Sequence, residues 1–111
     1  MNPIVKATWI AALRSGEYKQ AKSKLHRDDG GFCCLGVLCD LHAKIHGKQW
    51  EHRGTYYSYF GADGYLPNSV LAWAGLENNG SSVRIRESNL ANLNDDGQSF
   101  ERIAELIEAE L

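Results

Sequence analysis

The segment from Gly31 to Gly47, GFCCLGVLCDLHAKIHG, constrains the fold more than any other part of the sequence. It is the densest apolar run, and it holds all three cysteines and two of the four histidines. A helix over residues 34–46, at about 100° per residue, gathers its apolar side chains on a wide sector. The central stripe consists of Cys34, Leu38, Leu41 and Ile45, and the row beside it consists of Leu35, Cys39, His42 and His46. A sector this wide predicts a helix embedded in the core, and Gly47 is a suitable C-terminal stop.

Gly36 falls on the outer face of this predicted helix, together with Asp40, Ala43 and Lys44. A glycine inside a helix costs about 1 kcal/mol relative to alanine. Close approach of another backbone offsets that cost, because glycine has no Cβ. We therefore expect a second backbone segment, such as a strand, to cross the first turn of the helix at Gly36.

Helical and strand-like patterns alternate along the rest of the chain. Helices are predicted from Asn2 to about residue 15 with Trp9 as a core anchor, over 66–75, for one turn near 90–93, and over 99–111. Strands are predicted as a hairpin over 17–33, as two or three short strands over 48–65, and as an edge strand over 83–86. The pattern predicts an α+β fold: a single compact domain over residues 1–111, with four helices, two of them short, packed on a small, mainly antiparallel sheet.

The composition restricts the partners and the cellular compartment. A net charge of −2 argues against a nucleic-acid polymer as partner, because such binding needs a basic face. No apolar run reaches the length of a bilayer span, and no basic segment followed by an apolar one opens the chain, so we expect neither a membrane anchor nor a signal peptide. Three cysteines, two of them adjacent, make a poor disulfide framework, so we expect reduced thiols in a cytoplasm.

A zinc site is one hypothesis for the central helix. Cys39, His42 and His46 lie at i, i+3 and i+7 on one row, and His26 or Cys33 would supply a fourth ligand. Tetrahedral sites usually draw ligand pairs from separate elements, however, and no C-x-x-C motif is present. The favoured interpretation places the cysteines in the core and the histidines at its border, with no cofactor.

A cysteine nucleophile is the enzyme hypothesis. A helix N-terminus favours the thiolate of Cys33 or Cys34, and a nearby histidine would act as base. The neighbours Phe32 and Leu35 oppose this, because they bury the thiols and raise their pKa values. We therefore expect a protein without enzymatic activity.

Binding is the hypothesis that combines most features. Tyr56, Tyr57 and Tyr59 can stack on a base, while arginines can meet its phosphates. The arginines in question are Arg53, Arg84 and Arg86. The polar loop 78–82 can cradle a phosphate through backbone N–H groups, although it lacks the lysine and helix start of a nucleotide-binding loop. The same aromatic surface suits a protein partner, and with the 83–86 edge it favours a homodimer or higher homo-oligomer.

Three phrases of the sequence occur together with Trp9 and with Leu13-Arg14-Ser15-Gly16-x-Tyr18. They are Phe32-Cys33-Cys34-Leu35-Gly36-Val37-Leu38-Cys39-Asp40-Leu41, Leu66-Pro67-x-x-Val70-x-x-Trp73-x-Gly75-Leu76, and Leu93-Asn94-Asp95-x-Gly97-x-Ser99-Phe100-x-x-Ile103-Ala104. In these phrases the chain resembles a family of small proteins of tailed phages and prophages. The resemblance implies a phage origin and the cytoplasm of the host cell, and it assigns no catalytic residue.

Small accessory phage proteins often counter host defences, and we base the expected function on this analogy. We expect a non-enzymatic binding protein that sequesters a nucleotide immune signal. The alternatives are an inhibitor that binds a host defence protein directly and a small zinc-binding structural module.

Overall fold

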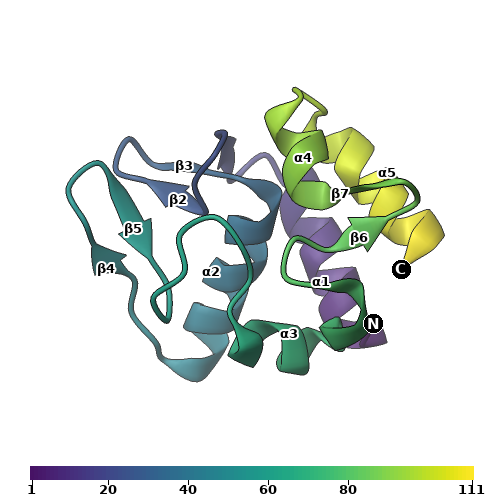
Figure 1. The fold of residues 1–111 in the computed structure, drawn as a ribbon, viewed down its shortest axis with the longest axis horizontal. Coiled ribbons are helices and arrows are strands. Elements are labelled where there is room, and N and C mark those ends of the chain that lie inside the picture. The colour runs from purple at the N-terminus through teal and green to yellow at the C-terminus, as the bar shows by residue number, and fades with distance from the viewer.

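Helix α2 (Cys34–His46) lies in the middle of the fold, with a small β-sheet on one side and the α1–α4–α5 group on the other (Figure 1). The computed structural model describes all residues from 1 to 111. The other helices are α1 (Pro3–Arg14), α3 (Asn68–Ala74), α4 (Leu90–Asp95), α5 (Phe100–Glu110) and the short 3₁₀-helix η1 (Glu77–Asn79). None of the helices has both the length and the apolar character needed to span a bilayer. The predicted α+β single domain is confirmed, with the turn expected near residue 90 present as a fifth α-helix.

Five short strands form the sheet in the order β1-β3-β2-β5-β4. They are β1 (Lys19–Gln20), β2 (His26–Arg27), β3 (Gly31–Phe32), β4 (Glu51–His52) and β5 (Tyr56–Ser58). All neighbours are antiparallel except β1 and β3, so the sheet is mainly antiparallel, as predicted. The hairpin expected over 17–33 is shorter than predicted, because only β2 and β3 form its arms and β1 pairs in parallel at the sheet edge.

The edge strand predicted over 83–86 is only partly present. Strands β6 (Arg84–Ile85) and β7 (Ser88–Asn89) form a separate two-stranded ladder. Val83 and Arg86 on either side of β6 have φ angles of 57° and 53°, which are left-handed and end the extended backbone. The extended part of the predicted edge strand is thus only two residues long, and one of its edges is paired with β7.

The buried face of α2 is rotated from the predicted one. Ile45, expected in the central stripe, is 62% exposed, whereas Gly36 and Ala43, expected to face outward, are buried. The reason is the crossing at Gly36. The side of α2 that carries Gly36 packs against the backbone of Leu25, just before β2, and is therefore buried. The predicted crossing itself is confirmed: a Cβ on Gly36 would lie 1.7 Å from the carbonyl oxygen of Leu25.

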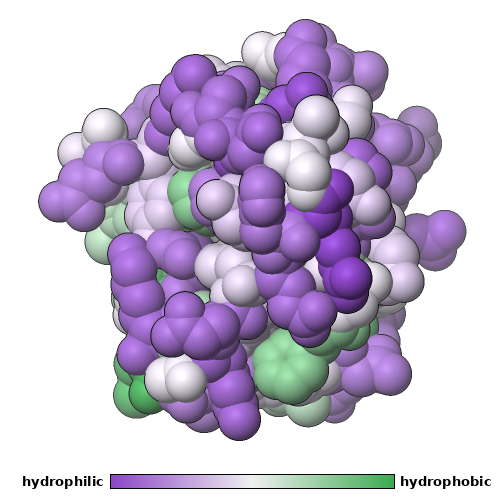
Figure 2. All heavy atoms as spheres, turned by 90° about the vertical axis from the view of Figure 1, so that its left-hand side faces the viewer, coloured by the Kyte–Doolittle hydropathy of each residue, from purple (hydrophilic) through white to green (hydrophobic).

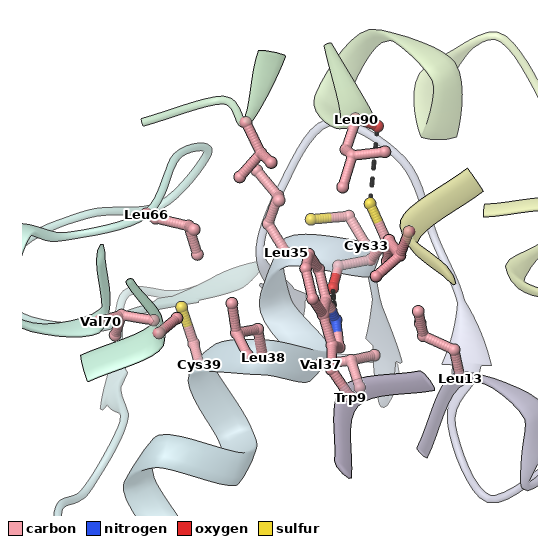
Figure 3. Close-up of a cluster of buried hydrophobic side chains, with 14 of the residues drawn as sticks. Trp9, Leu13, Cys33, Leu35, Val37, Leu38, Cys39, Leu66, Val70 and Leu90 are labelled. Carbon is pink, nitrogen blue, oxygen red and sulfur yellow. Dashed lines mark hydrogen bonds between the residues drawn. The ribbon is translucent and has the colours of Figure 1, made fainter. Parts of the chain in front are cut away.

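Trp9 is fully buried and joins α1 to α2, as expected of a core anchor. Its indole Nε1–H donates to the carbonyl oxygen of Cys34 at 3.0 Å, which is drawn as a dashed line in Figure 3. Helix α1 also packs along α5. Leucines and valines from α1, α2, α3 and α4 surround the indole and the three cysteines (Figure 3).

The helix starts differ in how they are capped. Asn2 accepts hydrogen bonds from the N–H groups of Ile4 and Val5 at 2.9 and 3.0 Å and so caps α1. At the start of α2, Cys33 supplies no side-chain cap. Asn94 of α4 does so from a distant part of the chain, because its Oδ1 accepts from the N–H of Cys34 at 3.1 Å.

The crossing at Gly36 predicts a large loss of stability for Gly36→Ala. The added methyl group meets backbone rather than a movable side chain, so we expect the free energy of unfolding to fall by about 3 kcal/mol or more. Gly47→Ala is the matched control, because Gly47 has φ 65° and open space around it, and should cost about 1 kcal/mol. Chemical denaturation of both variants measures the difference, and equal losses would contradict the prediction.

Candidate functional site

The structure does not bring the six predicted ligand-binding residues into one site. Arg53, Tyr56 and Tyr57 belong to the β4–β5 hairpin, whereas Arg84 and Arg86 belong to the β6–β7 ladder. Figure 1 shows these two hairpins at opposite sides of the molecule, with α2 between them. No single small ligand can therefore contact all six residues.

Tyr59 cannot stack on a ligand, because it is 1% exposed. Its hydroxyl donates to Nδ1 of His42 at 2.5 Å, and burial raises the pKa of Tyr59 to about 12. The pKa of His42 is lowered by burial and then by the nearby positive charges of His46 and Lys48, so His42 is neutral and can accept this bond. Tyr59 and His42 are a buried hydrogen-bonded pair.

The other three residues of the predicted aromatic site are engaged within the chain. The guanidinium of Arg53 lies 3.0 Å from Glu51 and donates to Ser58 Oγ at 3.1 Å. The ring of Tyr57 stacks on His26, and Lys24 Nζ lies 4.1 Å from the centre of the Tyr56 ring. These contacts are those of a half-buried sheet face.

The predicted zinc candidates do not converge either. Cys39 is fully buried and its sulfur lies beside Val70 (Figure 3), while burial holds the pKa of this thiol well above its usual value. The ring of His46 stacks on His42 with centres 4.1 Å apart, and its Nδ1–H donates to the carbonyl oxygen of His42. No group of three or more histidine, cysteine or acidic side chains is placed to hold a metal ion.

The thiols at the start of α2 are inaccessible. Cys33 is 5% exposed and Cys34 is fully buried, with its Sγ–H donating to the carbonyl oxygen of Leu90 at 3.5 Å. Burial raises the pKa of Cys33 to about 11 and that of Cys34 well above its ordinary value. Both are protonated at neutral pH, so the helix N-terminus does not make either a nucleophile.

The two arginines of the β6–β7 ladder differ in their partners. Arg86 forms an ion pair with Glu110 at 3.0 Å. Arg84 forms no ion pair within the chain. Of the three predicted phosphate-binding arginines, only Arg84 is exposed with a guanidinium that no acidic side chain neutralises.

Arg84 lines a polar groove of about 550 Å³ between η1 and the β6–β7 ladder. The groove is lined by Asn78, Asn79, Gly80, Ser81, Ser82, Val83, Arg84, Glu87, Ser88, Asn89 and Asn92. The backbone N–H groups of Ser81 and Ser82 donate no hydrogen bond within the chain. The sequence predicted free backbone donors for a phosphate in this loop. We call the whole depression, with the lining given above, the polar groove.

A second hollow, of about 370 Å³, opens next to the polar groove. It is lined by Phe60, Gly61, Ala62, Tyr65, Leu66, Pro67, Asn68 and Ser81, and we call it the aromatic hollow. Ser81 lines both depressions, so they are neighbours on one surface. Phe60 and Tyr65 are 54% and 50% exposed.

The β4–β5 side of the molecule exposes few apolar side chains (Figure 2). Figure 2 shows the β4–β5 side as mostly hydrophilic, with hydrophobic residues gathered toward its lower edge, at the level of the C-terminal end of α2 in Figure 1. Besides Phe60 and Tyr65, the large exposed hydrophobic side chains are Ile45, near that end of α2, and Ile4 of α1.

Phe60 occupies a backbone conformation that disfavours it. Phe60 and Gly61 have φ angles of 50° and 79°, and two hydrogen bonds between Tyr59 and Ala62 close a two-residue turn around them. Asparagine or glycine is normally preferred at the first position of such a turn. A left-handed bulky residue costs about 1–2 kcal/mol, and the half-exposed ring offsets only part of this by burial. Backbone strain at an exposed aromatic residue makes Phe60 a candidate binding residue.

Sequence reasoning missed Phe60 and Tyr65 as site residues. The binding hypothesis used Tyr56, Tyr57 and Tyr59 and did not include the aromatic side chains at and after the turn that follows them. The detectable signal was a Phe-Gly pair at the turn itself, where Asn-Gly would be expected.

Comparison with known proteins places the whole chain, residues 1–111, in the family described as Domain of unknown function (DUF8296), and the chain belongs to that family. No curated protein matches the chain. No solved structure matches it.

Burial of the thiols predicts that the native protein resists alkylation. We expect iodoacetamide at neutral pH to leave Cys33, Cys34 and Cys39 unmodified, and to label all three after unfolding in guanidinium chloride. Intact-mass spectrometry counts the adducts in both states. Rapid labelling of a native thiol would show that it is exposed, contrary to the structure.

The lowered pKa of His42 predicts a stability that falls in mild acid. Below the ordinary value of 6.5, the unfolded chain takes up a proton on His42 more readily than the folded chain, so folding becomes less favourable as the pH falls. The difference in free energy of unfolding between wild type and His42→Gln should therefore shrink as the pH falls from about 7 to about 5. Urea denaturation at several pH values measures it, and a constant difference would refute the assignment.

Proposed function

We propose that this chain is a non-enzymatic, phage-type accessory protein that sequesters a small nucleotide signal in the host cytoplasm and so blunts a host defence. The phage assignment rests on the sequence phrases around Cys33–Cys34, Trp73 and Asn94. The binding assignment rests on one observation above all: the polar groove offers an unpaired arginine beside free hydrogen-bonding groups.

The side chains of the polar groove support a polar ligand. Five of them make no hydrogen bond within the chain: Asn78, Ser81, Ser82, Ser88 and Asn92. Arg84 adds the geometry that suits two oxygens of a phosphate. A groove of about 550 Å³ falls within the usual size range of small-molecule sites. A phosphate-bearing molecule of nucleotide size matches these properties.

Capture rather than catalysis suits the same residues. The polar groove contains no histidine or cysteine, and no hydrogen bond joins any of its serines to its one carboxylate, Glu87. The three thiols are buried, and His42, whose pKa is lowered by burial, is bonded to Tyr59 below the surface. The ligand should therefore be released unchanged when the protein is denatured.

A protein partner is the second candidate, and the exposed apolar side chains favour it. Phe60, Tyr65 and Ile45 are each at least half exposed, and aromatic side chains dominate the energy of many protein interfaces. Such a partner would be a host defence protein or a second copy of this chain. The homodimer stays a prediction, now resting on this apolar surface rather than on β6.

The proposed function predicts that Arg84→Ala weakens ligand binding. Isothermal titration calorimetry with 5′-mononucleotides and cyclic dinucleotides should give heat with at least one of them, and the loss of Arg84 should lower that affinity about tenfold to hundredfold, as for other hydrogen bonds to charged groups. Arg53→Ala is the matched control, because Arg53 lies in the distant β4–β5 hairpin and should leave the affinity unchanged.

Chromatography of the ligand recovered after denaturation should show the starting compound. Two results together would contradict sequestration: no heat with any nucleotide, and a stable host-protein complex that is lost in Phe60→Ala. They would favour the second candidate, a protein partner.

A further inference from the structure

The polar groove and the aromatic hollow are two halves of one site, and we infer that it takes a nucleoside monophosphate or a phosphodiester-linked nucleotide. Its base lies against Phe60 and Tyr65, and its phosphate meets Ser81, Ser82 and Arg84. The inference rests on the proposed function and adds the class of ligand, its orientation and the residues on which the base stacks.

Ser81 is the wall that the two depressions share. Its carbonyl oxygen accepts from the N–H of Leu66 at 2.8 Å, which ties the polar loop to the start of α3. Its own N–H and its hydroxyl make no bond within the chain, so both are free to meet a ligand that passes from one hollow to the other. A ligand at Ser81 therefore touches both environments at once.

The two environments differ in the way the two ends of a nucleotide differ. The aromatic hollow presents two half-exposed rings, which suit the flat face of a base whatever its identity. The polar groove presents hydroxyl, amide and guanidinium groups, which suit a phosphate and a sugar. A plain phosphate would leave the rings unused, and a plain aromatic molecule would leave Arg84 unpaired.

Phe60 is held rigidly enough to act as a stacking surface. Its two-residue turn is closed by hydrogen bonds between Tyr59 and Ala62 at 2.8 and 3.0 Å. The ring meets the buried ring of Tyr59 edge to face, with centres 4.8 Å apart, and Tyr59 is in turn bonded to His42. The Phe60 ring thus contacts the core through Tyr59 while about half of the residue faces solvent.

The charges of the polar groove limit the ligand to few phosphates. Arg84 and Glu87 are its only charged side chains, so the groove itself carries no net charge. One arginine matches one phosphate, whereas a triphosphate would bring further negative charge near Glu87. The carboxylate of Glu87 can instead accept hydrogen bonds from ribose hydroxyl groups. This balance selects a monophosphate or a phosphodiester over a nucleoside triphosphate.

The test compares ligands that share a phosphate and differ in the base. Calorimetry of the full chain with AMP, GMP, CMP and UMP should show at least one that binds about tenfold or more tightly than ribose 5-phosphate, because stacking on an aromatic ring adds affinity. The triphosphate of the same nucleoside should bind more weakly than the monophosphate. Equal affinity for ribose 5-phosphate and for all four mononucleotides would overturn the inference while leaving phosphate capture intact.

The variant Phe60→Asn separates binding from folding. Asparagine suits the first position of this turn, so the variant should unfold at the same or a higher temperature than wild type. Its affinity for the best mononucleotide should fall about tenfold, to the level of ribose 5-phosphate, whose own affinity should not change. Ile45→Asn is the control, because Ile45 is exposed but lines neither hollow, and it should bind as wild type does.

An unchanged mononucleotide affinity in Phe60→Asn would refute the placement of the base. If wild type binds neither the mononucleotides nor ribose 5-phosphate, the proposed function and this inference fail together. If it binds ribose 5-phosphate in an Arg84-dependent way and gains nothing from a base, only this inference fails.

Discussion

The contact of the Leu25 backbone with Gly36 is the constraint on which the arrangement of this fold depends. The carbonyl of Leu25 lies where a side chain at residue 36 would stand, and it accepts from the N–H of Cys33, while the Leu25 N–H donates to the carbonyl of Asp63. One residue therefore joins the start of α2, the approach to β2 and the loop between Phe60 and Tyr65. The sheet can lie this close to the helix only because residue 36 has no Cβ, and the loop that carries the exposed aromatic rings is positioned by the same contact.

Asn94 completes the connection on the opposite side of α2. It is fully buried, and its Oδ1 accepts from Cys34 N–H and from Gln20 Nε2 while its Nδ2 donates to the carbonyl of Ala21. A buried amide is tolerated only when its hydrogen-bonding groups are used, and here the start of α2 and the Gln20–Ala21 segment use them. Helix α2 thus receives its N-terminal cap from α4 rather than from Cys33, which leaves both thiols free to pack in the core.

Much of the fold was predictable because it depends on local chemistry. Asn2 and Ser99 cap their helices, Gly47 ends α2 in the left-handed conformation, and Gly36 indicated a close crossing. The errors arose where a distant segment decides the outcome. Ile45 was predicted inside and is exposed, because the crossing chain rotates the buried face of α2. Tyr59 was predicted as a binding residue and is buried, because the partner that satisfies its hydroxyl, His42, lies 17 residues earlier. Neither periodicity nor residue density contains that information.

Tyr59 and Phe60 are adjacent aromatic residues, but Tyr59 is buried and Phe60 is half exposed. The difference follows from the two-residue turn that is closed between Tyr59 and Ala62. The backbone turns into the left-handed region at Phe60, so the two neighbouring side chains point in different directions. Tyr59 takes the inward position because its hydroxyl donates a hydrogen bond to a neutral imidazole. Phe60 has no polar group that needs a partner, yet it stands in the strained outward position at a turn where asparagine would be less costly. A chain shaped only by stability would exchange this phenylalanine for a polar residue. Phe60 lines the aromatic hollow beside the polar groove, and the proposed ligand would account for its position by covering the ring.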